Sequence, residues 1–364
     1  MKILIVDDDQ FVLQVMSAVL AAAGHSDVTL ARSAKDAVCT ITAASKPFDL
    51  CLVDITMPDI DGIELCRWIR NEPNYRAIPI LMVTAKADKI HIDRAFAAGA
   101  TEYVTKPIDV EEFQRAVSQY AVSADKDEGQ PEMAAAPDGA GKSPAERGID
   151  FHQGIRLPEV PHILDYKALQ NYVLAISRIG LLDTRIFAFK VKGVGKIYAG
   201  ATSEDFVSVL TCVAQSISGS MKTSEFFLAY AGEGAFVCVA RGRTAQNLGK
   251  IEQDTNRRIR RAHLTDSAGI PIDAPVRVGP QIRGGLIRSG QSVVDAMQVA
   301  ITKAEERTCL ESDDDESKSA LFELFDVLMP YNTVLRPKSA VAQVNNHQTE
   351  RALAAAFRAA STEH

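Results

Sequence analysis

The sequence predicts an α/β fold with a five-stranded parallel sheet over residues 1–120, a flexible linker at 121–150, an α+β domain with an antiparallel sheet at 151–335, and a C-terminal tail at 336–364. Three observations indicate this organisation. Short apolar segments alternate with amphipathic ones in the first third of the chain, as in βα repeats. A stretch rich in proline, glycine and small residues follows. Beyond it, two apolar segments are joined by a short turn with two glycines, as in a β-hairpin.

The predicted strands of the first part are continuous apolar runs, which are typical of a parallel sheet covered by helices on both faces. The segments between them place apolar residues at helical spacing, and Gly24, Gly62 and Gly99 lie at helix margins as turn or capping signals. The strands are expected at Lys2–Val6, Val28–Ala31, Leu50–Val53, Ile78–Val83 and Thr101–Val104, and the helices at Phe11–Ala23, Ala34–Ala44, Ile63–Asn71, Lys89–Ala98 and Val110–Tyr120.

The linker contains no aromatic residue between positions 121 and 148. Such a segment cannot bury enough apolar surface to offset the entropy lost on ordering, so we interpret it as a flexible tether. Residues 136–143, A-P-D-G-A-G-K-S, loosely match a phosphate-binding loop. Because no predicted strand precedes this match and no predicted helix follows it, a linker is favoured over an ATP site.

For the second part, the sequence predicts an antiparallel sheet with helices packed on it. The tail receives no assignment beyond a short helix at 348–359. The helices are expected at 164–179, 205–217, 245–262 and from Ser292 onward, and the strands at 185–192, 226–230, 235–240 and 276–287.

The composition is that of a globular protein, with 24% charged residues and a formal net charge of −7. This acidic balance gives no general attraction to DNA or anionic membranes, so we expect neither as a partner. The apolar run at 3–6 is too short for a signal peptide or a membrane span, which predicts a cytoplasmic protein. The cysteines lack C-x-x-C spacing and are expected to be buried reduced thiols rather than disulfides or zinc ligands. They are Cys39, Cys51, Cys66, Cys212, Cys238 and Cys309.

Charged residues follow three of the predicted strands: Asp7 and Asp8 the first, Asp54 the third and Lys106 the fifth. Because functional groups collect beyond the carboxyl ends of parallel strands, we expect these side chains to share one crevice. Carboxylates held together repel each other and favour a compensating cation. Mg²⁺ fits best, since it accepts a few carboxylates and leaves room for phosphate oxygens.

Four motifs lie at the ends of predicted strands: V-D-D-D at 6–9, L-V-D-I-T-M-P-D-I-D-G at 52–62, V-T-A at 83–85 and Y-V-T-K-P at 103–107. Together they resemble the receiver domain of two-component response regulators, which has a flavodoxin-like fold. The resemblance covers residues 1 to about 120. It implies that Asp54 is the phosphoacceptor, that Asp8 and Asp54 bind Mg²⁺ together with the carbonyl of Thr56, and that Asp7 acts through a bound water.

The same resemblance implies that Lys106 and Thr84 contact the phosphoryl group, and that Thr84 and Tyr103 form a coupled conformational switch. It also implies a histidine kinase or phosphotransfer protein as phosphodonor, and it leaves open a homodimer through the fourth and fifth helices. Taken singly, Asp7 would fit a helix cap, Lys106 a surface lysine and Tyr103 sheet packing. Asp9, Asp59 and Asp61 are interpreted as solvated or turn-forming carboxylates.

The predicted hairpin of the second part contains the sequence Gly232-Glu233-Gly234-Ala235-Phe236. With this turn, the second part resembles a degenerate diguanylate cyclase (GGDEF) domain in which the acidic pair of the motif is gone. Lys190 and Lys192 stand where the family carries metal-binding aspartates, and the inhibitory R-x-x-D is missing at 223–226. Since GTP condensation needs metal ions, the sequence predicts no cyclase activity. The arginines at 257–261 are interpreted as a solvated helix end rather than a nucleic-acid or phosphate site.

The function expected from the sequence is therefore that of a response regulator that signals to a downstream protein partner through a catalytically inactive module. Two alternatives stay open. The module could still make cyclic di-GMP with an unusual metal site, or it could be a receptor for cyclic di-GMP or GTP.

Overall fold

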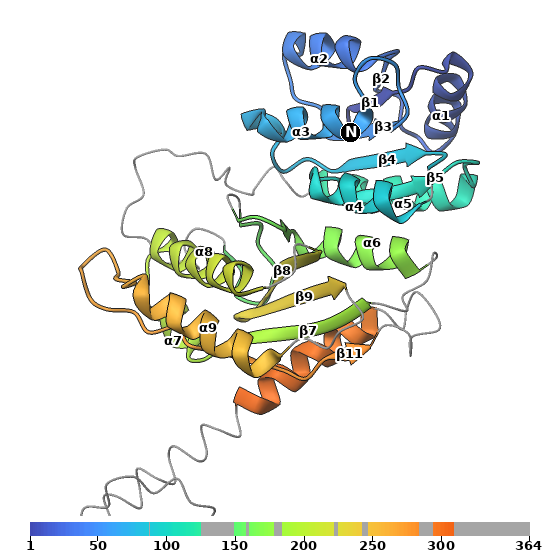
Figure 1. Ribbon diagram of the computed structural model, residues 1–364. Helices are drawn as coiled ribbons and strands as arrows, with labels where there is room; N and C mark the ends of the chain where they lie inside the picture. The colour runs from blue at the N-terminus through green and yellow to red at the C-terminus, as the bar shows by residue number, and fades with distance from the viewer. Residues whose placement is uncertain are drawn as a thin grey trace, which may run out of the picture. The chain divides into compact units, whose positions relative to one another are not determined.

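The computed structural model describes residues 1–86, 88–124, 149–157, 160–177, 184–221, 225–241, 247–283 and 294–308. Most of the predicted linker and all of the predicted tail lie outside these ranges. The described residues form two sheets, each with helices on both faces (Figure 1).

The first sheet has the strand order β2-β1-β3-β4-β5, and every neighbouring pair is parallel. This confirms the predicted five-stranded α/β fold. The strands are β1 (Ile3–Val6), β2 (Val28–Ala31), β3 (Leu50–Val53), β4 (Ile80–Thr84) and β5 (Glu102–Thr105), and the helices are α1 (Gln10–Ala22), α2 (Ala34–Ala43), α3 (Gly62–Asn71), α4 (Lys89–Ala97) and α5 (Val110–Ala124).

Alternate residues of β1 face opposite sides of the sheet, as the geometry of a strand requires. Ile3 and Ile5 belong to the core under α1 and α5, whereas Leu4 and Val6 belong to the core under α2, α3 and α4. Helix α5 extends past its predicted end at Tyr120 because the next residues, A-V-S-A, contain no helix breaker.

Four of these helices begin at a residue whose side chain accepts a backbone N–H of the first turn. The turn-forming interpretation of Asp9 and Asp61 is thereby confirmed. The caps are Asp9 for α1, Ser33 for α2, Asp61 for α3 and Asp88 for α4.

The second sheet has the order β10-β7-β9-β8-β6, with β11 also paired to β7. The predicted antiparallel sheet is confirmed for β7 to β11, whereas the short β6 runs parallel to β8 and makes the sheet mixed. The predicted hairpin is confirmed as β8 and β9. The strands are β6 (Ile163–Leu164), β7 (Thr184–Val191), β8 (Phe226–Gly232), β9 (Ala235–Arg241), β10 (Val276–Val278) and β11 (Ile282–Arg283), and the helices are α6 (Tyr166–Ser177), α7 (Val194–Gly200), α8 (Ser203–Ser220) and α9 (Leu248–Arg261).

We call this sheet, its helices and the helical residues 294–308 the C-terminal module. Helices α8 and α9 cover the face of β7 that carries Phe187 and Phe189. Helix α6 and residues 294–308 contribute to the core on the opposite face, with Ile186 and Ala188. Helix α7 was not predicted. The strand expected at 276–287, with interruptions at glycines, is formed as β10 and β11, and residues 284–287 lie outside the described ranges.

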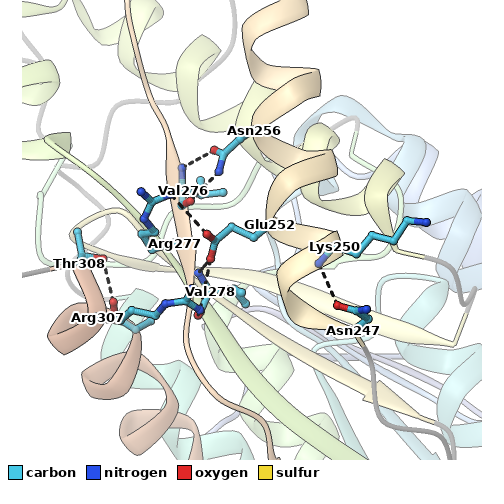
Figure 2. Close-up of polar contacts among 10 residues, drawn as sticks. Asn247, Lys250, Glu252, Asn256, Val276, Arg277, Val278, Arg307 and Thr308 are labelled. Carbon is cyan, nitrogen blue, oxygen red and sulfur yellow. Dashed lines mark hydrogen bonds and ion pairs between the residues drawn. The ribbon is translucent and has the colours of Figure 1, made fainter. Parts of the chain in front are cut away.

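The outer edge of β10 is paired with side chains instead of another strand (Figure 2). The side-chain oxygen of Asn256 accepts the N–H of Val276 at 2.8 Å, and its amide nitrogen donates to the carbonyl of Val276 at 3.0 Å. Glu252 Oε2 accepts the N–H of Val278 at 2.9 Å, and Arg307 donates to the carbonyl of Val278 at 2.7 Å. All four bonds satisfy buried or half-buried groups of β10 that its ladder with β7 leaves open.

Replacing Glu252 by alanine is expected to lower the free energy of unfolding by about 2–3 kcal/mol, because the N–H of Val278 loses its acceptor in a buried position. The matched variant Glu252→Gln keeps an acceptor and gives up only the charge that faces Arg277, at 3.4 Å, and Arg307, at 3.5 Å. We expect it to lose less than half as much. Urea unfolding of both variants measures the difference, and equal losses would contradict this account of β10.

Of the described cysteines, Cys51, Cys66 and Cys238 are buried and Cys212 is half-buried, but Cys39 is exposed, so the prediction of a buried thiol was wrong there. Cys309 lies outside the described residues. Helix α2 buries the face with Ala34, Ala37 and Ile41, and Cys39 lies off that face. Burial raises the pKa of the Cys66 thiol to about 11, which leaves it protonated.

None of the described helices combines the length and hydrophobicity that a membrane span requires.

Candidate functional site

The structure brings together Asp7, Asp54 and Lys106 at the carboxyl ends of β1, β3 and β5. Lys106 Nζ lies 2.6 Å from Asp7 Oδ2 and 3.0 Å from Asp54 Oδ1. Asp7 is 1% and Asp54 4% exposed, so both carboxylates are almost removed from water. The parallel topology explains this convergence, since it places all the strand ends on one edge of the sheet.

Asp54 is fixed by hydrogen bonds of both its side chain and its backbone. Its Oδ2 accepts the N–H of Thr56 at 2.7 Å, and its own N–H donates to the carbonyl of Val6 at 2.9 Å. Burial raises the pKa of the Asp54 carboxyl, while the hydrogen bond and charge of Lys106 act in the opposite direction. Asp54 is thus a poorly solvated carboxylate in a fixed position beside one cation.

Lys106 supplies that cation. Burial alone lowers the pKa of its ammonium group, but the hydrogen bonds and charges of Asp7 and Asp54 outweigh burial, so the pKa is raised overall. The side chain therefore stays charged at neutral pH. It can neutralise negative charge that arrives next to Asp54.

The predicted cation ligands are only partly assembled. Asp8 and Thr56 are exposed at the same end of the sheet, and Asp7 Oδ1 accepts the N–H of Asp9 at 3.0 Å. Within the described ranges, no three Asp, Glu, His or Cys side chains are arranged to hold a metal ion. Between Asp7 and Asp54 it is Lys106 that provides the compensating charge. The predicted donors are all oxygen atoms, which is the chemistry that a hard divalent cation prefers.

Thr84 and Tyr103, the predicted switch pair, both contact the backbone of Lys86. Thr84 is fully buried at the end of β4, and its Oγ1 accepts the N–H of Lys86 at 3.2 Å. The hydroxyl of Tyr103 donates to the carbonyl of Lys86. Burial raises the pKa of Tyr103, so its hydroxyl remains a donor. Lys86 was missed by the sequence analysis, because it takes part only through its backbone.

Gly62 was expected only to mark a helix margin, but it also shapes the site. A Cβ atom at this position would lie 1.9 Å from the backbone carbonyl oxygen of Asp54. Its N–H donates to the carbonyl of Ile55 at 2.9 Å. The first turn of α3 therefore packs directly behind the Asp54 segment, and only glycine fits there.

In the C-terminal module, Lys190 Nζ lies 2.5 Å from Glu305 Oε1, so this ammonium group is already paired. The hairpin turn contains one acidic residue, Glu233, whose Oε1 lies 2.5 Å from Nδ1 of His152. Gly232 has a φ of 99°, and a Cβ there would lie 2.4 Å from the carbonyl oxygen of His152. The turn thus packs closely against the segment that contains His152.

The predicted arginines lie exposed at a helix end, whereas the choice of a solvated end over a nucleic-acid or phosphate site stays a prediction. Arg258, Arg260 and Arg261 occupy the last turn of α9, where positive charge complements the helix dipole. Arg257 pairs with Asp254 one turn earlier.

The residues that carry the first site match a known family, the response regulator receiver domain, over residues 3–118. A CheY chemotaxis protein homologue of Campylobacter jejuni is 33% identical over 107 residues, which are 29% of this chain and 82% of that protein. The heme response regulator HssR of Staphylococcus haemolyticus is 39% identical over 112 residues, 31% of this chain and 47% of HssR.

The chain thus spans about half the length of HssR. Among solved structures, the BeF3-activated DrrB receiver domain is 28% identical, with a TM-score of 0.30, and the match covers 33% of this chain and 97% of that one. Through its residues 3–118, this chain belongs to the response regulator receiver domain family.

Proposed function

We propose that this chain is a phosphorelay response regulator in which Asp54 accepts a phosphoryl group from a histidine kinase or a phosphotransfer protein. The observation that carries the proposal is the buried Asp54 carboxylate, held by the N–H of Thr56 and by Lys106 at a strand end of a receiver-family chain. Such a carboxylate is a fixed nucleophile with its charge compensated.

In this proposal, an Asp54 oxygen attacks phosphorus, the bond from phosphorus to the donor breaks, and the donor leaves with its electron pair. Lys106 neutralises charge on the transferred group, and Thr84 donates its hydroxyl to a phosphoryl oxygen. Asp8, Asp54 and the carbonyl of Thr56 would hold Mg²⁺, with Asp7 acting through a bound water. The ion would neutralise the remaining charge of the phosphoryl oxygens.

The test is incubation of the full chain with acetyl phosphate and Mg²⁺, followed by intact-mass spectrometry. We expect one acid-stable, base-labile phosphoryl group per chain, and none when a chelator removes Mg²⁺. Absence of labelling with the metal present, or labelling on a residue other than Asp54, would contradict the proposal.

Replacing Asp8 by alanine is expected to raise the Mg²⁺ concentration needed for half-maximal labelling by about tenfold or more, because a carboxylate ligand is lost. The matched control is Asp9→Asn, which changes the neighbouring carboxylate but keeps a side chain able to cap α1. Titration of Mg²⁺ against the labelling rate measures both. An unchanged Mg²⁺ dependence in Asp8→Ala would remove Asp8 from the ligand set.

For the C-terminal module we propose a role in protein–protein interaction, as a degenerate GGDEF-like domain without cyclase activity. Two features support this. Lys190 and Lys192 stand where metal-binding carboxylates would be needed, and Lys190 is paired with Glu305. An ammonium group cannot coordinate a metal ion, and the charge of Lys190 is already neutralised by Glu305.

The alternatives are an active cyclase and a nucleotide receptor. Incubation of the full chain with GTP and Mg²⁺ or Mn²⁺, in the presence of beryllium fluoride, tests the first, and formation of cyclic di-GMP would overturn our proposal. Calorimetry with cyclic di-GMP and with GTP tests the second. Heat of binding would favour a receptor, and its absence would remove that alternative.

A further inference from the structure

An open hollow of about 580 Å³ lies where the C-terminal ends of α8 and α9 meet. The two helices lie side by side on one face of the second sheet (Figure 1). Among the described residues, the lining contributes three guanidinium groups, those of Arg257, Arg258 and Arg261, and one carboxylate, that of Asp254. We call this surface the arginine hollow.

Two of the three guanidinium groups are available to a ligand. Arg257 pairs with Asp254, which neutralises that carboxylate. Arg258 and Arg261 are exposed, and within the described ranges neither of them forms an ion pair. The arginine hollow therefore carries an excess of positive charge on a chain whose formal net charge is −7.

The helix dipole explains only part of this charge. A cation in the last turn complements the partial negative charge at a helix C-terminus. Arg257 and Arg261 are four residues apart, however, and Arg258 and Arg261 are three apart, and like charges at these spacings destabilise a helix. This repulsion is relieved when anionic groups lie among the guanidinium groups.

Gly219, in the last turn of α8, makes room for Arg258. A Cβ atom at this position would lie 2.9 Å from Nη1 and 3.1 Å from Cζ of Arg258. The guanidinium therefore lies against the backbone of α8. This contact restricts the side chain before any ligand binds, which lowers the entropy lost on binding.

The surroundings of the arginines favour carboxylates over phosphate. Phosphate sites are typically built from backbone N–H groups at a helix N-terminus. Here two helices end, and the free backbone groups of a helix C-terminus are carbonyls with partial negative charge. Arginines one helical turn apart match carboxylates that stand about 6–7 Å apart on one side of an extended acidic segment.

The remaining lining also fits a protein. Met221 and Ala262, the C-cap residues of α8 and α9, add apolar surface beside the arginines, and methionine and arginine are both enriched in protein interfaces. A long polyanion such as DNA or RNA would be repelled over most of its length by the net charge of −7. A short acidic segment meets only the arginine hollow.

We propose that the C-terminal module binds its protein partner through the arginine hollow, and that the partner contributes a short segment rich in aspartate and glutamate. The inference rests on the interaction role proposed above for this module. In the complex, Arg258 and Arg261 pair with carboxylates of the partner, and Met221 and Ala262 contact the apolar parts of its side chains.

The test is binding of fluorophore-labelled octaglutamate to the full chain, measured by fluorescence anisotropy, with labelled octaglutamine as the reference peptide. We expect saturable binding of octaglutamate that weakens as salt screens the charges, and no binding of octaglutamine. If octaglutamate does not bind, the arginines are a solvated helix end only, and the inference is overturned.

Reversing the charge of one arginine locates the binding surface. Arg258→Glu and Arg261→Glu are each expected to weaken octaglutamate binding by about tenfold or more, because a like charge then faces the peptide. The matched control is Arg260→Glu, which makes the same change in the same turn of α9 but outside the lining. It should weaken binding by less than about threefold. Equal losses in all three variants would indicate general attraction and contradict the proposal.

Gly219→Ala separates binding from stability. The added Cβ displaces the guanidinium of Arg258, the flexible end of a side chain, whereas alanine favours the helical backbone. We expect urea unfolding at the wild-type denaturant concentration or above it, with octaglutamate binding weakened by about threefold or more. Wild-type binding in this variant would remove Arg258 from the surface and count against the inference.

Further arms of the experiment distinguish other anions. If a single-stranded oligonucleotide or cyclic di-GMP binds the wild-type chain but not Arg258→Glu, and octaglutamate binds neither, the hollow is a nucleic-acid or nucleotide site and the inference fails. Formation of cyclic di-GMP from GTP would overturn the interaction role of the module itself. If no cyclic di-GMP forms and octaglutamate does not bind, only the assignment of the arginine hollow is lost.

Discussion

Replacing Asp54 by asparagine is expected to abolish phosphoryl labelling of the chain. Asparagine preserves the shape of the side chain, but its amide has neither the charge nor the nucleophilic oxygen that attack on phosphorus requires. Burial raises the pKa of the native carboxyl, which shows that its charge is held at a cost in this site. The variant should therefore fold at least as stably as the wild-type chain while losing the reaction.

The matched control is Asp59→Asn, in the same segment between β3 and α3. Asp59 is exposed and has a φ of 66°, a backbone conformation that asparagine adopts readily. Intact-mass spectrometry after incubation with acetyl phosphate and Mg²⁺ should show wild-type labelling for Asp59→Asn and none for Asp54→Asn. Labelling that persists in Asp54→Asn would place the acceptor elsewhere.

Replacing Gly62 by alanine is expected to lower the free energy of unfolding by about 3 kcal/mol or more, since the added Cβ would meet a backbone atom that has no room to yield. The separation from the Asp54 carbonyl oxygen would be 1.9 Å. Either α3 or the Asp54 segment must move. Labelling at Asp54 should fall together with stability, because the carboxylate is positioned by that same segment.

Gly249→Ala provides the comparison. Gly249 lies in α9, where a Cβ would have no neighbour closer than 3.8 Å. There alanine is expected to stabilise the chain by about 0.5–1 kcal/mol, since it restricts the unfolded backbone. Urea unfolding distinguishes the two substitutions. A Gly62→Ala chain as stable as the wild type would show that the first turn of α3 can be displaced without penalty.

The core of the receiver site could be predicted from the sequence because topology does most of the positioning. Asp7, Asp54 and Lys106 each follow a strand, and parallel strands end at one edge. Lys86 could not be predicted in the same way. It contributes a backbone N–H and a carbonyl, which every residue except proline possesses.

The contacts of α6 with α4 and β5 could not be predicted from the sequence. Asp93 of α4 and Arg241 of β9 form an ion pair although they lie 148 residues apart, and each fits an ordinary position on a helix or a strand. The parallel strand β6 has only two residues, which is too short for an alternating pattern. Local periodicity therefore predicted most elements of both sheets but not the contacts that join α6 to α4 and β5.

The side-chain pairing of β10 by Asn256, Glu252 and Arg307 has a consequence for the behaviour of the protein in a crowded cell. An open edge strand is a template on which a strand of another chain can add, and repeated addition leads to aggregates. Here the N–H and carbonyl groups of Val276 and Val278 that would recruit such a strand are occupied. At β10, the sheet is therefore closed to growth by intermolecular strand addition.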